Sequence, residues 1–291
     1  MNLATPLPVG RLKCWMLEGG LQHLDGGAMF GVVPKPLWER RIAADERNRI
    51  PLAMRCLLVE HPDGAVLVDT GLGNKENEKF REIYGVQNTG RAGPTQLEDA
   101  LAAAGFQPGD VRWVINTHLH FDHAGGNTSV TGGTPPRLSF PNATYVVQRG
   151  ELEFALHPPE RAAASYLAHN FVPVSQADRW RLSAGDTELL PGIQVRPTPG
   201  HTPHHQSVWV TDGPDCALFI GDLVPTSAHL PLPWIMGYDL EPMVTLETKR
   251  RVLAQAEAEG WTLVFEHDPV IRAGRVVKEG KSYGCAPLDT P

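Results

Sequence analysis

Short apolar runs bounded by turn residues recur along the whole chain. Val111–Ile115 and Ile193–Pro197 are typical: each is too short for most helices, rich in β-branched residues, and followed by Gly, Pro or Asn. Such runs predict buried strands. The predicted strands cover residues 11–17, 53–60, 65–69, 111–115, 143–148, 193–197, 207–211, 216–220, 263–265 and 275–278.

Helical periodicity appears between these strands in both halves of the chain. The predicted helices cover residues 75–84, 95–104, 149–156, 160–169 and 243–259. Because strands and helices interleave, we expect an α/β fold with helices outside layered sheets. No Ser- or Gly-rich linker divides the chain, so residues 1–291 are interpreted as one domain with two αβ halves, about 1–170 and 171–291.

Residues 19–36 are rich in Gly and Pro and also carry large apolar side chains. A long loop of this composition predicts a lid or a pocket wall. The alternative is a hydrophobic patch for dimer contact, so a homodimer is left open.

Composition narrows the choice of partners. The chain is 42% hydrophobic and 20% charged, as in ordinary globular proteins, and its net charge is -7 with a pI of about 5.9. This acidity disfavours nucleic acid and anionic membranes as partners. No apolar run is long enough to cross a bilayer and residues 1–20 have no leader pattern, so we expect a cytoplasmic protein. The four cysteines (Cys14, Cys56, Cys216, Cys285) lie far apart, which favours free thiols.

Candidate chemistry is concentrated directly after the predicted strand 111–115. His118, His120, Asp122 and His123 follow one another there, and a Gly-rich turn comes next. In an extended chain alternate side chains point to the same side, so His118 and His120 can bind one ion together. Asp122 and His123 come after the chain has turned and can reach a second ion. Imidazole and carboxylate are ligands of zinc, iron, cobalt and manganese.

Three more potential ligands each follow a predicted strand. His201 comes after the strand 193–197, Asp222 after 216–220, and His267 after 263–265. Alone, each has an ordinary explanation as a turn, cap or core residue. Together with the first cluster they predict a metal centre built at strand ends.

These motifs, in this order and approximate spacing, resemble the metallo-β-lactamase superfamily over nearly the whole chain. The resemblance implies a four-layer αβ/βα sandwich with two mixed sheets inside and helices outside. It implies that His118, His120 and His201 hold one metal, that Asp122, His123 and His267 hold another, and that Asp222 bridges. It also implies that Asp69, in Val68-Asp69-Thr70-Gly71, orients a ligating histidine.

Within the superfamily, residues 118–127 and 199–203 are most similar to acyl-homoserine lactonases and methyl-parathion-hydrolase-like enzymes. Two positions depart from that pattern. His204 stands where these enzymes usually have Gly, and Pro225 stands where many lactonases have a Tyr that bonds the substrate carbonyl. His229 and Tyr238 are the nearest candidates to take that role.

We therefore expect a hydrolase that opens apolar lactones or esters, with N-acyl-homoserine lactones as the expected substrates. The hypothesis is attack by a hydroxide shared by two divalent ions, zinc first and cobalt, manganese or iron as alternatives, with Asp122 and Asp222 as the catalytic carboxylates. Apolar side chains in loops that flank these motifs predict the walls of the substrate pocket. They are Met29, Phe30, Trp38, Phe140, Phe171, Trp234 and Met236, with the polar His229 and Tyr238 near the last two.

Other functions remain open at this point. Phosphotriester or aryl ester hydrolysis uses the same ligands, and a persulfide dioxygenase would use a single redox iron. Glyoxalase II-like and ribonuclease Z-like activities are disfavoured, because no basic C-terminal extension or basic arm is evident. The alternative outside enzymology is a metal-dependent binder of small molecules without turnover.

Overall fold

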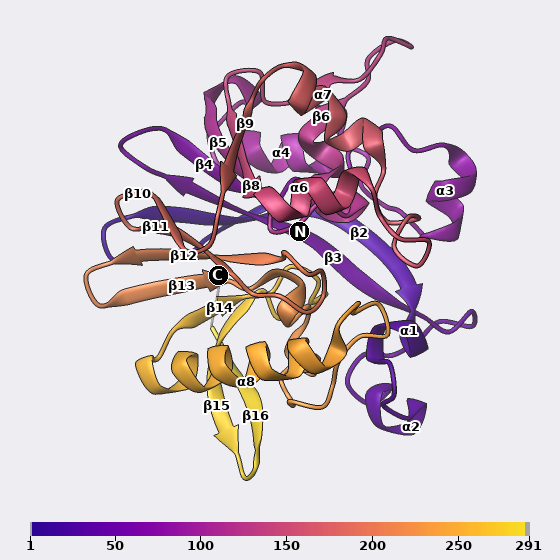
Figure 1. Cartoon of the computed structure of the whole chain (residues 1–291), viewed down its shortest axis with the longest axis vertical. Coiled ribbons are helices and arrows are strands. Elements are labelled where there is room, and N and C mark those ends of the chain that lie inside the picture. Colours follow the sequence, from indigo (N-terminus) through magenta and orange to yellow (C-terminus); the bar gives the residue numbers. More distant parts are fainter. Residues whose placement is uncertain (1, 289–291) are drawn as a thin grey trace.

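Two seven-stranded sheets form the centre of the computed structural model, which describes residues 2–288 (Figure 1). The first sheet is antiparallel from β1 to β4 and parallel from β4 to β9. Its strands in spatial order are β1 (Ala4–Pro6), β2 (Lys13–Asp25), β3 (Arg49–Glu60), β4 (Ala65–Val68), β5 (Val111–Ile115), β8 (Thr144–Gln148) and β9 (Trp180–Ser183).

The second sheet is antiparallel except for the parallel pair β13 and β14. Its strands are β10 (Thr187–Leu190), β11 (Ile193–Pro197), β12 (Gln206–Asp212), β13 (Asp215–Phe219), β14 (Thr262–Val264), β15 (Ala273–Glu279) and β16 (Ser282–Pro287). A separate two-stranded sheet pairs β6 (Thr128–Ser129) with β7 (Arg137–Leu138).

Helices lie outside the two sheets. The α-helices are α1 (Gly26–Phe30), α2 (Lys35–Trp38), α3 (Glu78–Ile83), α4 (Gln96–Ala103), α5 (Phe121–Ala124), α6 (Arg149–Leu156), α7 (Val172–Gln176) and α8 (Pro242–Glu259). Short 3-10 turns are η1 (Pro108–Asp110), η2 (Gly125–Asn127), η3 (Ala168–Asn170), η4 (Gly221–Leu223) and η5 (Ser227–His229).

Four layers result from how these elements bury their apolar faces. One core cluster lies between the sheets and contains Val68 of the first and Phe219 of the second. A second cluster packs α4 on the outer face of the first sheet, and a third packs α8 on the outer face of the second. The helix α4 contributes Leu97, Ala100 and Leu101, which the i, i+3, i+4 spacing places on one face. The predicted αβ/βα sandwich is confirmed.

The segment 19–36 is not the long loop that its glycines predict. Strand β2 continues through Gly19 and Gly20 to Asp25, and its pairing with β3 shifts register between Glu18 and Leu21. Gly20 has φ +125, and a Cβ on Gly19 would lie 2.5 Å from the Met54 carbonyl oxygen. The two glycines therefore form a β-bulge in a paired strand, and the short helices α1 and α2 come next in the chain.

The helix expected over residues 160–169 is wrong. Turns occupy most of this segment, and only Ala168–Asn170 forms a 3-10 turn. Residues of this segment form hydrogen bonds with distant parts of the chain in place of helical ones. The Phe121 N–H donates to the Ser165 carbonyl at 2.9 Å, and the Tyr166 hydroxyl donates to Glu151 at 2.8 Å. Local helix preference is a weak prior against such contacts.

Other sequence expectations have mixed outcomes. The chain contains strands β1, β9, β10 and β16, which the pattern did not predict. All four cysteines are free thiols, as expected; Cys14 and Cys56 are buried, whereas Cys216 and Cys285 are half-buried. Within residues 2–288, no helix combines the length and apolarity needed to span a bilayer.

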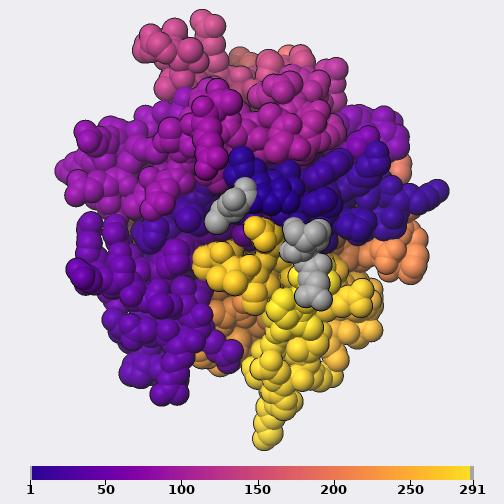
Figure 2. Space-filling model, turned by 180° about the vertical axis from the view of Figure 1, so that it is seen from behind, coloured from indigo at the N-terminus to yellow at the C-terminus, as the bar shows by residue number. Residues whose placement is uncertain are grey.

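The two sheets divide the chain close to the expected midpoint. The first sheet ends with Ser183 and the second begins with Thr187, slightly beyond the predicted division at residue 170. Seen from behind, the indigo N-terminal segment lies between the magenta part of the first half and the yellow C-terminal part (Figure 2). The core cluster shared by both sheets supports the interpretation as one domain, which stays a prediction.

Candidate metal centre

Four strand ends bring the predicted ligands together. His118 and His120 follow β5, with Asp122 and His123 in the short helix α5; His201 follows β11, Asp222 lies in η4 after β13, and His267 follows β14. All of these side chains are buried. Because both sheets present their strand ends at the same edge, residues separated by more than a hundred positions become neighbours.

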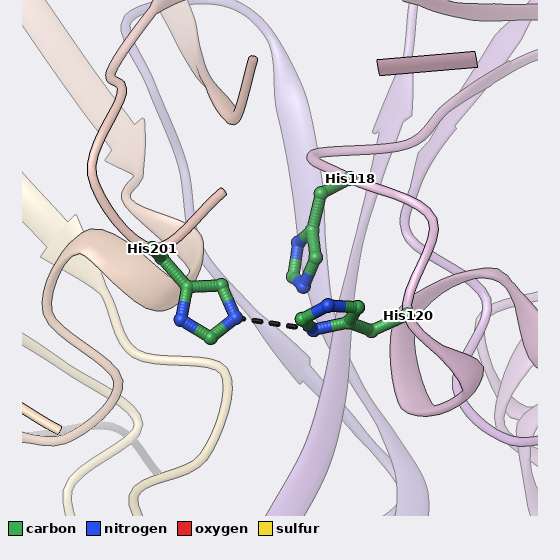
Figure 3. A group of neighbouring side chains, drawn as sticks. All are labelled: His118, His120 and His201. Carbon is green, nitrogen blue, oxygen red and sulfur yellow. Dashed lines mark hydrogen bonds between the residues drawn. The ribbon is translucent and has the colours of Figure 1, made fainter. Parts of the chain in front are cut away.

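One group of donors consists of His118, His120 and His201, whose side chains converge from two segments (Figure 3). One ring nitrogen of each lies within 4.8 Å of one nitrogen of the others. His201 Nε2 is 3.1 Å from His120 Nδ1. The structure thus brings together the three histidines of the first predicted ligand set.

A second group consists of Asp122, His123 and His267, which also meet within 4.8 Å. Asp222 lies between the two groups. Its Oδ2 is 3.1 Å from His201 Nε2, and its Oδ1 is 3.1 Å from His267 Nε2. Its carboxylate therefore faces one histidine of each group.

Most of these histidines are held through the ring nitrogen that faces away from the cluster. His201 Nδ1 is 2.9 Å from Asp239 Oδ1, and His267 Nδ1 is 2.7 Å from the Ala53 carbonyl oxygen. Such bonds fix the tautomer and the orientation of an imidazole ligand. Asp239 was missed in the sequence, because no motif connects it to His201.

Asp69 lies where the resemblance implies, against His123. Its Oδ2 is 3.1 Å from His123 Nδ1, and it accepts bonds from the Thr117 backbone N–H at 2.8 Å and hydroxyl at 2.7 Å. Glu266 Oε2 is 3.0 Å from the same His123 nitrogen. Glu266 was overlooked, although it directly precedes a predicted ligand. Asp69 also has φ +54, a conformation that costs about 1 kcal/mol or more outside glycine.

The charge balance of the site fits bound cations. Asp69, Asp122, Asp222 and Glu266 are all buried, and within residues 2–288 their ion-pair partners are histidines. Uncompensated buried carboxylates are costly, so this cluster requires positive charge. Divalent ions supply it and match the imidazole and carboxylate donors.

Protonation states favour metal binding at His118, His120 and Asp222. At His123, His201 and His267 burial lowers the pKa but nearby carboxylates outweigh it and raise it, to about 9 for His267, so a metal would displace protons from these three rings. Burial, and then the charges of His123 and its neighbours, lowers the pKa of His118 well below its usual value; His120 is shifted the same way. Burial raises the pKa of Asp222, but the adjacent histidines outweigh it and hold the pKa well below its usual range. Neutral imidazole and ionised carboxylate are the forms that ligate metals. The His118 Nε2 atom is buried without a hydrogen-bond partner among the described residues, as a free ligand atom would be.

A cavity of about 380 Å³ opens onto this cluster. His120, Asp122, His201, Asp222 and His267 form its polar floor. Its walls are largely apolar, and the lining outside the floor comprises Leu24, Ala28, Met29, Leu52, Tyr84, Phe121, Arg161, Ala162, Ser165, Met236, Gly237, Tyr238 and Leu240. An apolar cavity with a few polar groups is typical of small-molecule sites.

Only part of the predicted pocket lines this cavity. Met29, Met236 and Tyr238 do, and Leu24 and Ala28 show that segment 19–36 forms a pocket wall. The others pack elsewhere because their rings fill the core: Phe30 stacks on Trp38 at 5.3 Å and on His229 at 4.4 Å, Trp234 packs on the same cluster, and Phe140 and Phe171 belong to other core clusters.

The two departures from the lactonase pattern lie outside the cavity lining. His204 is exposed, packs against Gly150 and does not line the cavity. Pro225 is buried, and its carbonyl accepts a bond from the His267 N–H at 3.0 Å. His229 cannot take the role of the missing Tyr, since its Nε2 bonds the Met29 carbonyl oxygen at 2.8 Å.

Two buried residues that the sequence did not reveal fix the ligand segments. His205 Nε2 accepts a bond from the Asp222 backbone N–H at 3.1 Å, and Gly221 leaves no room for a Cβ beside that nitrogen. Glu151 accepts bonds from the Leu119 N–H at 3.1 Å and from the Thr202 hydroxyl at 2.7 Å. Their roles depend on tertiary proximity alone, so no local pattern could show them.

Comparison with known families decides the affiliation. The family model described as the metallo-beta-lactamase superfamily matches residues 51–267, which contain every predicted ligand. This chain belongs to the metallo-beta-lactamase superfamily. The family predicted from the motifs is confirmed, and with it the predicted class of enzyme, a hydrolase.

Members of the superfamily with named activities are similar over most of the chain. An N-acyl homoserine lactonase, AiiA, of Bacillus thuringiensis subsp. kurstaki is 31% identical over 225 residues, which is 75% of this chain and 82% of that protein. The crystal structure of a probable metal-dependent hydrolase from Staphylococcus aureus has a TM-score of 0.87 and 31% identity, and the match covers 98% of this chain and 100% of that one.

A ligand-bound superfamily structure is also similar. An N-acyl homoserine lactone hydrolase with the product N-hexanoyl-L-homoserine bound at its catalytic metal centre has a TM-score of 0.66 and 26% identity, and the match covers 90% of this chain and 95% of that one. The two solved structures share the fold with this chain over 90% or more of its length.

Proposed function

We propose that this protein is a dinuclear metal-dependent lactonase acting on N-acyl homoserine lactones. The observation that carries the proposal is the pair of buried donor groups joined by Asp222 at the floor of an apolar cavity. Similarity to named N-acyl homoserine lactonases supports the choice of substrate. The apolar walls suit a neutral acyl chain better than a charged substrate.

His118, His120 and His201 would hold one divalent ion, and Asp122, His123 and His267 the other, with Asp222 reaching both. Bound there, such ions lower the pKa of a coordinated water from about 15.7 to about 7 and polarise a substrate carbonyl. Zinc suits the donors best, and cobalt, manganese and iron share the same ligand chemistry.

The carboxylates at the floor have distinct tasks. Asp222 lies within reach of both groups, so it can accept a proton from the attacking water and pass it to the leaving alkoxide oxygen. Asp122 accepts a hydrogen bond from the Gln22 side chain at 2.5 Å, which fixes the orientation of its carboxylate. The protein thereby supplies geometry and proton transfer, and needs no serine or cysteine nucleophile.

The test is a substrate panel of acyl homoserine lactones, aryl esters and phosphotriesters, run with metal analysis on the same preparation. We expect the lactones to be hydrolysed fastest, with activity removed by a chelator and restored by zinc. Higher activity on phosphotriesters or aryl esters would reassign the substrate. Oxygen uptake with a single iron would replace the hydrolase by a dioxygenase, and tight lactone binding without turnover would leave a binding protein.

Asp222→Asn tests the central carboxylate. Because Asn offers one neutral oxygen and an NH2 group in place of two anionic oxygens, we expect turnover to fall by about 100-fold or more and metal content to drop. Asp186→Asn, at an exposed position away from the centre, is the control and should behave as the parent does. Full metal content with full turnover in Asp222→Asn would contradict the proposed role.

A further inference from the structure

Few hydrogen-bond donors line the cavity apart from the candidate metal ligands. The side chains concerned are those of Tyr84, Tyr238, Ser165 and Arg161. Arg161 already donates to the Gly237 carbonyl oxygen at 2.7 Å, and Tyr238 is 40% exposed at the rim. Tyr84 is half-buried and reaches the cavity from the end of α3.

Tyr84 is held rigidly beside the metal motif. Its ring lies 4.4 Å from that of Phe80 and 4.9 Å from that of Phe121, measured between centroids. Its backbone N–H donates to the Phe80 carbonyl at 3.0 Å, and its carbonyl accepts from the His23 N–H at 2.7 Å. Because Phe121 directly precedes the ligand Asp122, the position of the Tyr84 ring is tied to the metal centre.

The Tyr84 hydroxyl is available as a donor. Burial, and then the charge of Asp122, raises the pKa of this phenol, so it stays protonated at neutral pH. Tyr84 lines the same cavity as the candidate ligands His120 and Asp122. Among the hydrogen bonds of residues 2–288, the Tyr84 hydroxyl has no side-chain or backbone partner within the protein. A ligand that enters the cavity in place of water can therefore accept its hydrogen bond.

We propose that the Tyr84 hydroxyl donates a hydrogen bond to a carbonyl oxygen of the bound substrate. The inference rests on the proposed function, since it assumes a carbonyl substrate above the metal centre. A rigid donor costs little ordering entropy on binding, so its bond contributes nearly in full. The bond positions the substrate, and it becomes stronger if the accepting oxygen gains negative charge during the reaction.

Tyr84→Phe removes the hydroxyl and keeps the ring that packs on Phe80 and Phe121. On the metal-loaded enzyme we expect kcat/KM for an N-acyl homoserine lactone to fall about 10-fold, the effect of one neutral to partly charged hydrogen bond. Metal content and the thermal unfolding midpoint should not change. Tyr283→Phe, at a half-buried tyrosine of β16 that does not line the cavity, is the matched control and should stay within about 2-fold.

A thionolactone, with sulfur in place of the carbonyl oxygen, separates hydrogen bonding from packing. Sulfur is a weak acceptor, so the difference between the parent and Tyr84→Phe should shrink if the bond goes to the lactone carbonyl. If only lactones that carry the acyl amide lose activity in the variant, the bond goes to the amide carbonyl. Both results support the proposal and assign the oxygen.

The inference is overturned if Tyr84→Phe stays within 2-fold of the parent, or if Tyr283→Phe shows the same loss. A loss in Tyr238→Phe, which removes the other phenol of the cavity, without a loss in Tyr84→Phe would also overturn it. If the parent enzyme cleaves aryl esters but not lactones, only the proposed lactonase function is overturned. The parent and Tyr84→Phe are then compared on the aryl ester, whose carbonyl takes the place of the lactone carbonyl. A metal-loaded parent that cleaves no carbonyl substrate overturns both.

Discussion

Replacing Glu151 by Ala should destabilise the protein and loosen its metal centre together. Glu151 is fully buried in α6 and accepts three hydrogen bonds, from the Leu119 N–H at 3.1 Å, the Tyr166 hydroxyl at 2.8 Å and the Thr202 hydroxyl at 2.7 Å. Leu119 lies between two candidate ligands, and Thr202 follows another. One carboxylate therefore ties together two ligand segments from different sheets.

The expected loss of stability can be worked out from these three bonds. A buried donor left without a partner costs about 1 to 3 kcal/mol, so three donors give about 3 to 9 kcal/mol. Hydroxyls can rotate toward other acceptors, and burial raises the pKa of Glu151, which shows that the native carboxylate itself is costly to bury. We therefore expect the lower end, about 3 kcal/mol, and a 10- to 100-fold weaker metal affinity.

Urea unfolding followed by circular dichroism, on metal-free and metal-loaded protein, measures the loss of stability. Competition with a chromophoric chelator measures the loss of metal affinity. Glu153→Ala on the same helix, at an exposed position, is the matched control. The reasoning would be refuted if the unfolding free energy of Glu151→Ala lay within about 1 kcal/mol of that of the control and the two variants retained metal equally.

Two further perturbations test other parts of the account. Gly221→Ala should cost more stability than Gly213→Ala and should also release metal. Both positions have positive φ, +56 and +62, but only at Gly221 would a Cβ lie 2.7 Å from His205 Nε2. Thermal unfolding and metal analysis of the two variants measure the difference. His229→Gln should flatten the pH dependence of stability. Burial lowers the pKa of His229 to about 3 in the native state, whereas the unfolded chain binds a proton there below about pH 6.5. In the parent, stability is therefore lost as pH falls from about 6.5 toward about 3. The slope of the unfolding free energy in that window should decrease by up to about 1.4 kcal/mol per pH unit, whereas the exposed His157→Gln should leave it unchanged. Equal losses in the two glycine variants, or an unchanged slope in His229→Gln, would count against these arguments.

The candidate ligands could be predicted because their signal is local. Each lies directly after an apolar run that only a buried strand explains, and the spacing of His118, His120, Asp122 and His123 is itself specific. The fold class could be predicted from the same runs, because interleaved strands and helices have few ways to bury both.

The surroundings of the site could not be predicted in the same way. Asp239 and Glu151 contact ligand segments that are distant in sequence, so no spacing marks them. Apolar character does not separate a pocket wall from a core either. Trp38 and Phe30 stack inside the protein, whereas Tyr84, which the helical pattern treated as a helix end, faces the cavity.

Anomalous scattering from a crystal of the zinc-loaded protein tests the central claim most directly. The account predicts two peaks at the zinc edge, one among His118, His120 and His201 and the other among Asp122, His123 and His267, with Asp222 reaching both. A single peak, or peaks elsewhere in the molecule, would contradict it.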